Sequence, residues 1–577
     1  MSTIRALATL TLAAALTLLP GAPLPGPAGP AGAQAQTVSV AAREGRRNLA
    51  FNLNGVTDWS AQQPFIDVMR TARPWEGHLR GQWGGIPEAE LIAGGYLDSD
   101  GWVLSVPPRA VKMVTLVLVD LPEDMNSVAG RYHVQWEGSA YLGFSGRARN
   151  VRYTGRNSAS FDFTPGPGQV IIEFNRGDLR NLSVVHERHL DRFAAGEVFN
   201  PDWLALIGDA ENLRFMDWMD TNDSTLSTWA DRPRVEDYSW ARRGVPLEVM
   251  LDLANQTGIE PWFTLPHLAD DDHIRRFGQM VQYRLRPDLR AWVELSNEVW
   301  NWQFTQAQWA EEQARERWGQ DSAWVQFYAL RAAQMVQILD DVFGDEPERL
   351  VRVLATHTGW LGLETDILDP PLIRGERLPA PYTLFDAYAV TGYFSGPLHS
   401  EENAPLVQDW LVESLARAED EADALGLTGE DRAAHVAAHR FDHAIAQAVP
   451  TLLTGAGLDT PTQSVMGHLD RVLTHHAAVA AAHDLALVMY EGGTHVLARP
   501  DQHDDEVLLE FLTALNYSDG MGTLYQALID GWGALTDAPF NAFVDVAAPT
   551  RWGSWGHLRH LDDDNPRWQA LMQATRP

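Results

Sequence analysis

Cysteine is absent from the 577 residues of the chain, which excludes disulfide bonds and cysteine metal sites. Lysine is nearly absent as well: Lys112 is the only one, although lysine and arginine together number 44. The formal net charge is −33, which argues against nucleic acids and anionic membranes as partners, because both are polyanions. No Gly-rich phosphate loop or nucleophile elbow of a Ser-His-Asp hydrolase is present, and we expect no cofactor.

The first 35 residues have the features of an export signal. Arg5 precedes an apolar stretch at residues 6–19, and Ala33-Gln34-Ala35 has the small-x-small form of a cleavage site. The apolar stretch is shorter than the ~20 residues of a membrane span, so a retained anchor is the less favoured alternative. We therefore expect residues 1–35 to be a signal peptide and the mature protein to be secreted or periplasmic.

Beyond the signal, eight short apolar runs alternate with helical patterns, which is typical of a (β/α)8 TIM barrel. A chain of this length predicts a large barrel with additions rather than one simple core. We expect the barrel to occupy residues 36–94 and 188–577. The predicted strands are residues 48–59, 213–218, 261–265, 291–298, 350–355, 386–391, 485–489 and 542–546, and the main predicted helices are 246–257, 322–343 and 506–535.

Two segments interrupt this alternation. Residues 95–187 contain short β-rich runs, such as 102–106, 132–136 and 170–174, separated by glycine and proline, which predicts an inserted antiparallel β-sandwich-like module. Its aromatic residues, Trp136 and Tyr141 among them, either bind sugar or form the core of a packing module. Residues 400–483 predict a helical excursion longer than a barrel connection needs.

Two of the apolar runs end abruptly in a glutamate. Residues 291–301 read Ala-Trp-Val-Glu-Leu-Ser-Asn-Glu-Val-Trp-Asn, and residues 487–493 read Leu-Val-Met-Tyr-Glu-Gly-Gly. The carboxyl ends of the strands form the active-site face of a β/α barrel, so Glu298 and Glu491 are expected at one mouth. A carboxylate at the end of a buried strand is costly unless it is paired or used chemically. Two such groups supply the proton donor and the nucleophile or base that glycosidic bond cleavage requires.

The Asn297-Glu298 pair and the later Tyr490-Glu491 resemble the catalytic residues of the clan A glycoside hydrolases, a (β/α)8-barrel group that carries them on strands 4 and 7. The resemblance implies that Glu298 is the general acid/base, that Glu491 is the nucleophile of a retaining mechanism, and that Asn297 binds the sugar 2-hydroxyl. Val299 stands where that clan most often has proline, so no single family is indicated. By analogy with the clan, the expected partner is a β-linked oligo- or polysaccharide substrate.

The same resemblance suggests further substrate-binding residues. It implies sugar contacts for His267 after strand 3 and His357 after strand 5, although each histidine could instead be a hydrogen-bonded core residue. Tyr393, after strand 6, resembles the tyrosine beside the nucleophile. After strand 8, one of Trp552 and Trp555 is expected to form the platform beneath the catalytic sugar.

Residues near the predicted strand ends complete the expected site. Trp300 and Trp302 follow Glu298 and are expected to supply apolar walls and sugar platforms. Glu294 is expected to brace the barrel, and Tyr490 or Tyr393 to orient Glu491. Weaker candidates are Arg214 within strand 2 and Asp217 and Trp218 at its end.

Two other functions fit parts of the sequence. One is a barrel that binds carbohydrate without catalysis. The other is a metal-dependent hydrolase that uses His267, Asp272 and His273. However, the run of three aspartates at residues 270–272 is typical of a helix N-terminus in solvent, so we assign no metal ligands.

Overall fold

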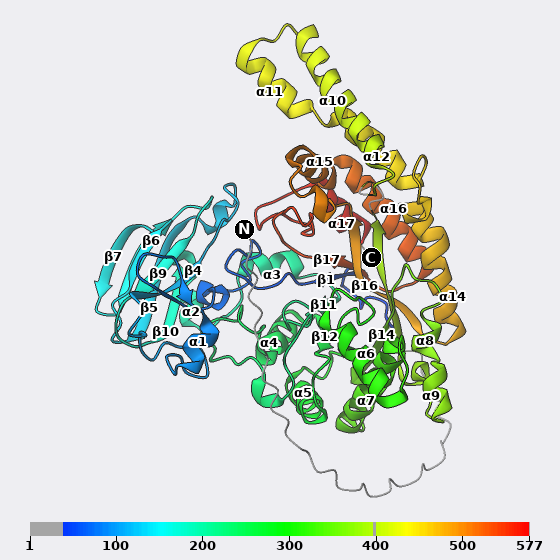
Figure 1. The fold of residues 1–577 in the computed structure, drawn as a ribbon, viewed down its shortest axis with the longest axis horizontal. Coiled ribbons are helices and arrows are strands. Elements are labelled where there is room, and N and C mark those ends of the chain that lie inside the picture. The colour runs from blue at the N-terminus through cyan, green and yellow to red at the C-terminus, as the bar shows by residue number, and fades with distance from the viewer. Residues whose placement is uncertain (1–38, 396–397, 399, 576–577) are drawn as a thin grey trace, which may run out of the picture. The chain divides into compact units, whose positions relative to one another are not determined.

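The computed structural model describes residues 39–395, 398 and 400–575, and the expected signal peptide lies outside them. Eight parallel strands close into one barrel, and each strand pairs with its neighbours in chain order (Figure 1). The predicted (β/α)8 barrel is therefore confirmed. Its strands are β1 (Leu49–Asn52), β11 (Asn212–Arg214), β12 (Glu260–Leu265), β13 (Ala291–Leu295), β14 (Leu350–Ala355), β15 (Ala387–Ser395), β16 (Ala486–His495) and β17 (Phe540–Phe543).

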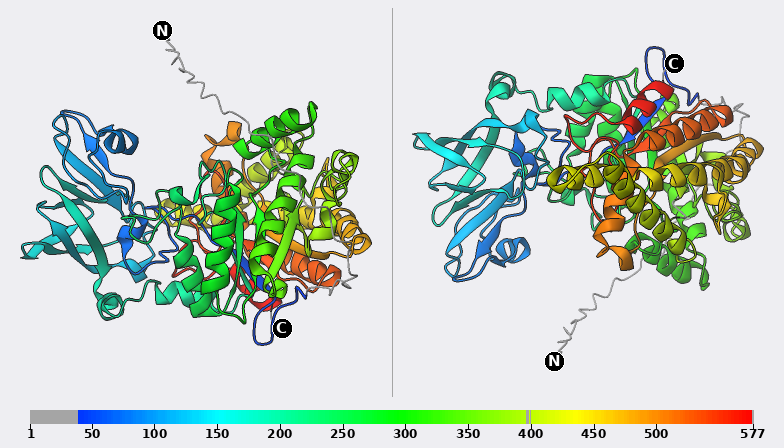
Figure 2. Two further views of the ribbon diagram at one scale, coloured as in Figure 1. Left: turned by 90° about the horizontal axis from the view of Figure 1, so that it is seen from below. Right: turned by 90° about the horizontal axis from the view of Figure 1, so that it is seen from above.

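Helices cover the outside of the barrel, as the two views of Figure 2 show. The strands are nearly continuous apolar runs because both of their faces are buried; every residue of β12 and β13 is buried. The covering helices include α4 (Leu247–Thr257), α5 (Asp271–Arg284), α6 (Thr305–Trp318), α7 (Trp324–Phe343), α15 (Glu506–Asn516), α16 (Asp519–Leu535) and α17 (Pro566–Ala574). None of the described helices combines the length and the apolar character that a membrane span needs.

Four barrel strands end earlier than the sequence pattern predicts: β1 ends at Asn52 and β13 at Leu295, and strands 2 and 8 are shortened as well. β11 ends at Arg214, because the chain then turns and the Met219 amide bonds to the Phe215 carbonyl at 2.8 Å. β17 ends at Phe543, since the Val544 amide bonds instead to the carbonyl of Trp555 at 2.9 Å. All four departures occur at the carboxyl ends of strands, where the chain leaves the barrel to form the mouth.

The predicted antiparallel β module is present after β1. A five-stranded sheet has the order β3-β2-β4-β9-β6, and a four-stranded sheet has the order β10-β5-β8-β7. Phe144 of one sheet contacts Phe161 of the other, with ring centroids 5.9 Å apart, so the sheets share a core. The strands are β2 (Glu76–His78), β3 (Gly85–Ile86), β4 (Lys112–Val117), β5 (Gly130–Gly138), β6 (Gly143–Gly146), β7 (Arg149–Gly155), β8 (Ser158–Phe163), β9 (Val170–Phe174) and β10 (Leu179–His186).

The module differs from the expectation in two details. Its first strands lie before residue 95, because β2 pairs with β4 and not with the barrel. The run at 102–106 forms no strand; only Val103 makes an isolated bridge, to Leu97. Trp136 is buried and its indole N–H donates to the carbonyl of Ala140 at 3.0 Å, whereas Tyr141 is exposed.

The helical excursion lies between β15 and β16. It consists of α10 (Ala404–Ala424), α11 (Gly429–His439), α12 (Asp442–Thr454), the short helix α13 (Val465–Gly467), a π-helical turn at His468–Leu473 and α14 (Thr474–Ala482). The helices α10 and α11 lie side by side as a hairpin (Figure 1).

Candidate active site

Glu298 lies just after β13, at a strand end with unusual backbone geometry. Its φ is 42° and that of Ser296 is 58°, both in the left-handed region that non-glycine residues rarely adopt. Such residues cost roughly 1–3 kcal/mol each and cluster at functional sites. Asn297 lies between them, and the side chains of Asn297 and Glu298 both line a cleft at the barrel mouth.

Glu491 lies within β16, where the strand pairing shifts by one residue. Val390 pairs with Met489 and Thr391 pairs with Glu491, so Tyr490 is the extra residue. Consecutive side chains of a regular strand point to opposite faces. The irregularity allows two consecutive residues to serve one site: Glu491 lines the cleft, and Tyr490 reaches Glu298.

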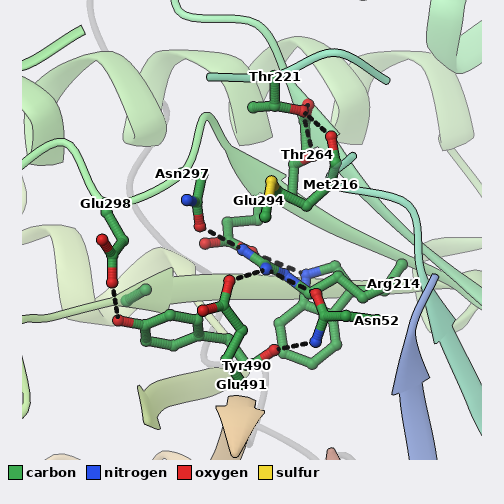
Figure 3. Close-up of polar contacts among 12 residues, drawn as sticks. Asn52, Arg214, Met216, Thr221, Thr264, Glu294, Asn297, Glu298, Tyr490 and Glu491 are labelled. Atoms are coloured by element: carbon green, nitrogen blue, oxygen red, sulfur yellow. Dashed lines mark hydrogen bonds and ion pairs between the residues drawn. The ribbon is translucent and has the colours of Figure 1, made fainter. Parts of the chain in front are cut away.

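Arg214, which is fully buried, connects the residues of the site (Figure 3). Its Nη1 donates to Oε1 of Glu491 at 2.9 Å and to Oδ1 of Asn52 at 3.0 Å. Its Nη2 donates to Oδ1 of Asn297 at 2.9 Å, and Nε and Nη2 both donate to Oε2 of Glu294, at 3.1 and 3.0 Å. The planar guanidinium thereby fixes residues from three other barrel strands or their ends. Only arginine has enough N–H donors in a rigid planar group to make all of these hydrogen bonds.

Each of the two candidate catalytic carboxylates also accepts a tyrosine hydroxyl. Tyr393 donates to Oε2 of Glu491 at 3.0 Å, and Tyr490 donates to Oε1 of Glu298 at 3.1 Å. Asn301 Nδ2 donates to the other oxygen of Glu298 at 2.9 Å. Both oxygens of each carboxylate therefore have a hydrogen-bond donor, which fixes the orientation of each group.

The electrostatics of the site favour the protonated form of its buried carboxyl groups. Burial raises the pKa of Glu491, which is 5% exposed, to about 8; Arg214 acts in the opposite direction, and the nearby Glu298 adds to the rise. Burial also raises the pKa of Glu294. One guanidinium charge thus faces two buried glutamates, so the ionised pair carries an excess negative charge that a single proton would remove.

A cleft of about 520 Å³ opens at the two glutamates. A second chamber of about 340 Å³ adjoins it and shares Asn54, Trp59 and Asp217 with it. Residues within β15, β16 and β17 and residues of the segments after β1, β11, β13 and β17 form the wall. Besides the glutamates, the cleft is lined by Asn54, Trp59, Met216, Asp217, Asn222, Asn297, Gln303, Phe304, Tyr393, His495, Phe543 and Trp555, among others.

Of the substrate-binding residues predicted from the sequence, three line this cleft: Asn297, Tyr393 and Trp555. The ring of Trp555 contacts those of Tyr393 and Phe543, with centroids 6.1 and 5.6 Å apart. Trp552 lies outside the cleft lining, exposed, with its ring against that of His503 at 4.5 Å.

The other predicted substrate contacts also lie outside the cleft lining. Trp300 is buried beneath it, against the rings of Tyr490 and Tyr328, so it supports the site from below. His267 is buried beside Trp309, and burial lowers the pKa of His267 to about 4, which keeps the ring neutral. His357 is exposed in the loop after β14.

The residues of the metal alternative serve other purposes. Asp270 caps α5 by accepting the amide of His273 at 2.7 Å, and Asp272 pairs with Arg276 at 2.8 Å. Across the described residues, the group with ligand atoms close enough to share an ion is Glu364, His475 and His476.

That second group is poorly suited to a metal. Nδ1 of His476 is 2.8 Å from the hydroxyl of Tyr388, and its Nε2 is 2.9 Å from the carbonyl of Thr358. Both ring nitrogens of His476 are therefore engaged, which leaves no free lone pair for an ion.

The sequence does not predict the contacts of Asn52 and Asn301, and it makes Arg214 only one of the weaker candidates. Asn52 donates to the carbonyl of Tyr490 at 2.7 Å, across 438 residues of chain. No local pattern around Asn52 could have shown this.

No protein-family model matches the chain, and no curated protein matches its sequence, so its function is inferred from the site.

Proposed function

We propose that the protein is a glycoside hydrolase that cleaves a β-linked oligo- or polysaccharide by a retaining double displacement. The observation that supports this most directly is the pair of glutamates in one cleft, one just after the fourth strand of the barrel and one in the seventh, each oriented by a tyrosine hydroxyl. Enzymes with this fold work at the carboxyl ends of their strands, and glycoside hydrolysis needs two carboxyl groups that flank the scissile bond.

In the first step, Glu491 attacks the anomeric carbon while Glu298 gives its proton to the departing glycosidic oxygen. The carbon–oxygen bond breaks, the alcohol leaves, and a glycosyl ester forms on Glu491. In the second step, Glu298, now ionised, takes a proton from water. The water oxygen attacks the anomeric carbon and releases Glu491 as a carboxylate, with the original anomeric configuration restored.

The surrounding residues support these steps. Arg214 and Tyr393 hold the Glu491 carboxylate in position through charge-assisted hydrogen bonds. Asn297 is fixed by Arg214 on one side, and its Nδ2 lies 3.2 Å from Oδ1 of Asn222 on the other. We assign it to a hydroxyl of the sugar whose bond is cleaved. Trp555 supplies an aromatic wall for the same sugar.

The test is turnover of a panel of 4-nitrophenyl β-glycosides and soluble β-glycans by the chain without residues 1–35. The products are followed by NMR, and retained configuration is expected. Glu298→Gln and Glu491→Gln should each lose at least about a thousandfold in kcat, a loss in line with the removal of a residue essential to the chemistry. Glu348→Gln, at an exposed position, is the matched control.

Azide distinguishes the two roles. With Glu491→Gly, azide should yield the glycosyl azide of inverted configuration; with Glu298→Gly and an activated substrate, it should yield the retained one. Inverted sugar product from the native protein would show that Glu491 is a base and not a nucleophile. Tight glycan binding that survives both glutamine replacements, with no turnover by the native protein, would identify a carbohydrate-binding protein instead.

A further inference from the structure

Two tryptophans are conspicuously exposed beside the candidate active site. Trp302 is 49% exposed and Trp360 is 51% exposed, and both contact the buried Trp324. The ring centroids of Trp302 and Trp324 lie 5.4 Å apart, and those of Trp324 and Trp360 lie 6.2 Å apart. Leu361, next along the chain, is exposed as well. Exposed apolar side chains that gather in this way mark binding surfaces more often than scattered ones do.

These rings lie on the loops that follow two neighbouring barrel strands. Trp302 belongs to the loop 296–304 after β13, and Glu298, Gln303 and Phe304 of that loop line the cleft. Trp360 belongs to the loop after β14, the strand that pairs with β13. The aromatic patch therefore adjoins the cleft on the side of Glu298.

Asn301 ties the position of Trp302 to that of Glu298. Its Nδ2 donates to Oε2 of Glu298 at 2.9 Å, and its Oδ1 accepts the amide of Gln303 at 3.1 Å. The same side chain thus orients the candidate proton donor and closes the turn that carries Trp302.

The cleft also continues in another direction, to the loops after β1 and β11. There Trp59, which is 57% exposed, and Asp217 border both the cleft and the second chamber. The second chamber thus offers room for a sugar beyond the one held between Glu298 and Glu491, and the aromatic patch offers an exposed surface on the side of Glu298.

We infer that the substrate is a glycan chain bound on both sides of the cleaved bond, with Trp302 and Trp360 stacked against sugars of the leaving group. This inference rests on the proposed function. Glu298 gives its proton to the departing oxygen, so the leaving group lies on the side of Glu298 and of its loop. Indole rings cover the apolar faces of sugars at low entropic cost, because they are large and rigid. A chain held on both sides is cut internally, so the protein acts as an endo-glycosidase.

The experiment compares two substrates of the same sugar with different leaving groups: a soluble β-glycan and the corresponding glycosyl fluoride, whose leaving group is one atom. Trp302→Ala and Trp360→Ala should each lower kcat/KM for the glycan by about threefold to tenfold, mainly through KM, and lower it much less for the fluoride. Trp302→Phe keeps an aromatic face and should recover part of the loss. Trp83→Ala is the control, because Trp83 is 56% exposed but lies in the β module.

Viscosity of the glycan solution should fall well before reducing ends accumulate, as internal cleavage requires. Equal losses on both substrates would overturn the inference, because they would mean that the tryptophans only position Glu298. Unchanged kinetics on both would also overturn it, while the proposed function stood. If the native protein turned over none of these substrates, the proposed function would fail and this inference with it.

Discussion

The hydroxyl of Tyr393 donates to Oε2 of Glu491 across 3.0 Å, and the two residues come from adjacent barrel strands, β15 and β16. The bond favours the ionised form of Glu491, which the proposed attack requires, whereas burial favours the protonated form. The balance between them sets the pH at which Glu491, the proposed nucleophile, becomes ionised.

Tyr393→Phe should therefore shift the pH dependence of catalysis. Without the hydroxyl, the pKa of Glu491 rises further above its ordinary value, and the acidic limb of kcat/KM moves to higher pH. A lost hydrogen bond to a charged group costs about 1.5–3 kcal/mol, so activity at neutral pH should fall roughly tenfold to hundredfold. A pH profile of kcat/KM for both proteins measures this. An acidic limb that stays in place would mean that another group controls it.

Glu491→Gln should increase stability at high pH. The pKa of Glu491 is about 8 in the folded protein against an ordinary 4.5, so the folded state retains a proton that the unfolded chain releases. The stability from this proton is complete below about pH 4.5 and is lost as pH rises through about 8. Glutamine cannot ionise, so the variant should exceed the native protein at pH 8 by on the order of a few kcal/mol, but not at pH 4.5.

Urea unfolding at the two pH values measures this difference, with Glu348→Gln as the exposed control. If the two proteins changed in parallel between pH 4.5 and 8, the folded-state pKa of Glu491 would not be raised.

Arg214→Met should be among the most damaging substitutions in the barrel. It leaves the buried Glu294 and Glu491 without a counter-charge, and breaking a buried pair in this way costs about 3–5 kcal/mol. Activity should be lost as well, because the same guanidinium holds Asn297. The double variant Arg214→Met/Glu294→Gln removes one of the orphaned charges and should recover part of the stability in urea unfolding. Additive losses in the double variant would argue that the pair is not coupled.

In the β module, Trp136→Ala should destabilise the protein without changing kcat/KM. Trp136 is buried and its indole N–H is hydrogen-bonded, so the substitution creates a cavity and costs about 3–5 kcal/mol. Tyr141→Ala, at the exposed position nearby, should cost much less. A loss of glycan affinity in Tyr141→Ala, measured by calorimetry, would instead support a sugar-binding role for the module.

The sequence could predict the barrel and the positions of Glu298 and Glu491, because both depend on local patterns. An apolar run that ends in a polar residue specifies a strand and its exposed end. It does not specify which way a later side chain points. His267 and His357 follow strand ends as Asn297 does, yet His267 packs against Trp309 and His357 faces solvent, outside the cleft lining.

Contacts across long stretches of chain were beyond prediction from a single sequence. Arg214 is hydrogen-bonded to Glu491 across 277 residues of chain, and the sequence near either residue does not predict this contact. The same limit applied to Trp552 and Trp555: both follow strand 8, and the hydrogen bond from the Val544 amide to the Trp555 carbonyl is one of the contacts that bring Trp555 to the cleft.

The closure of the barrel has a consequence for how the chain is made. β1, at residues 49–52, pairs on one side with β11 and on the other with β17, at residues 540–543. A nascent chain must therefore complete the β module and nearly all of the barrel before β1 acquires its second neighbour. Until then β1 and β16 each present an unpaired edge, and such edges are where incomplete chains associate with one another. A ribosome that stops before residue 540 would thus release an aggregation-prone product rather than a shortened folded protein.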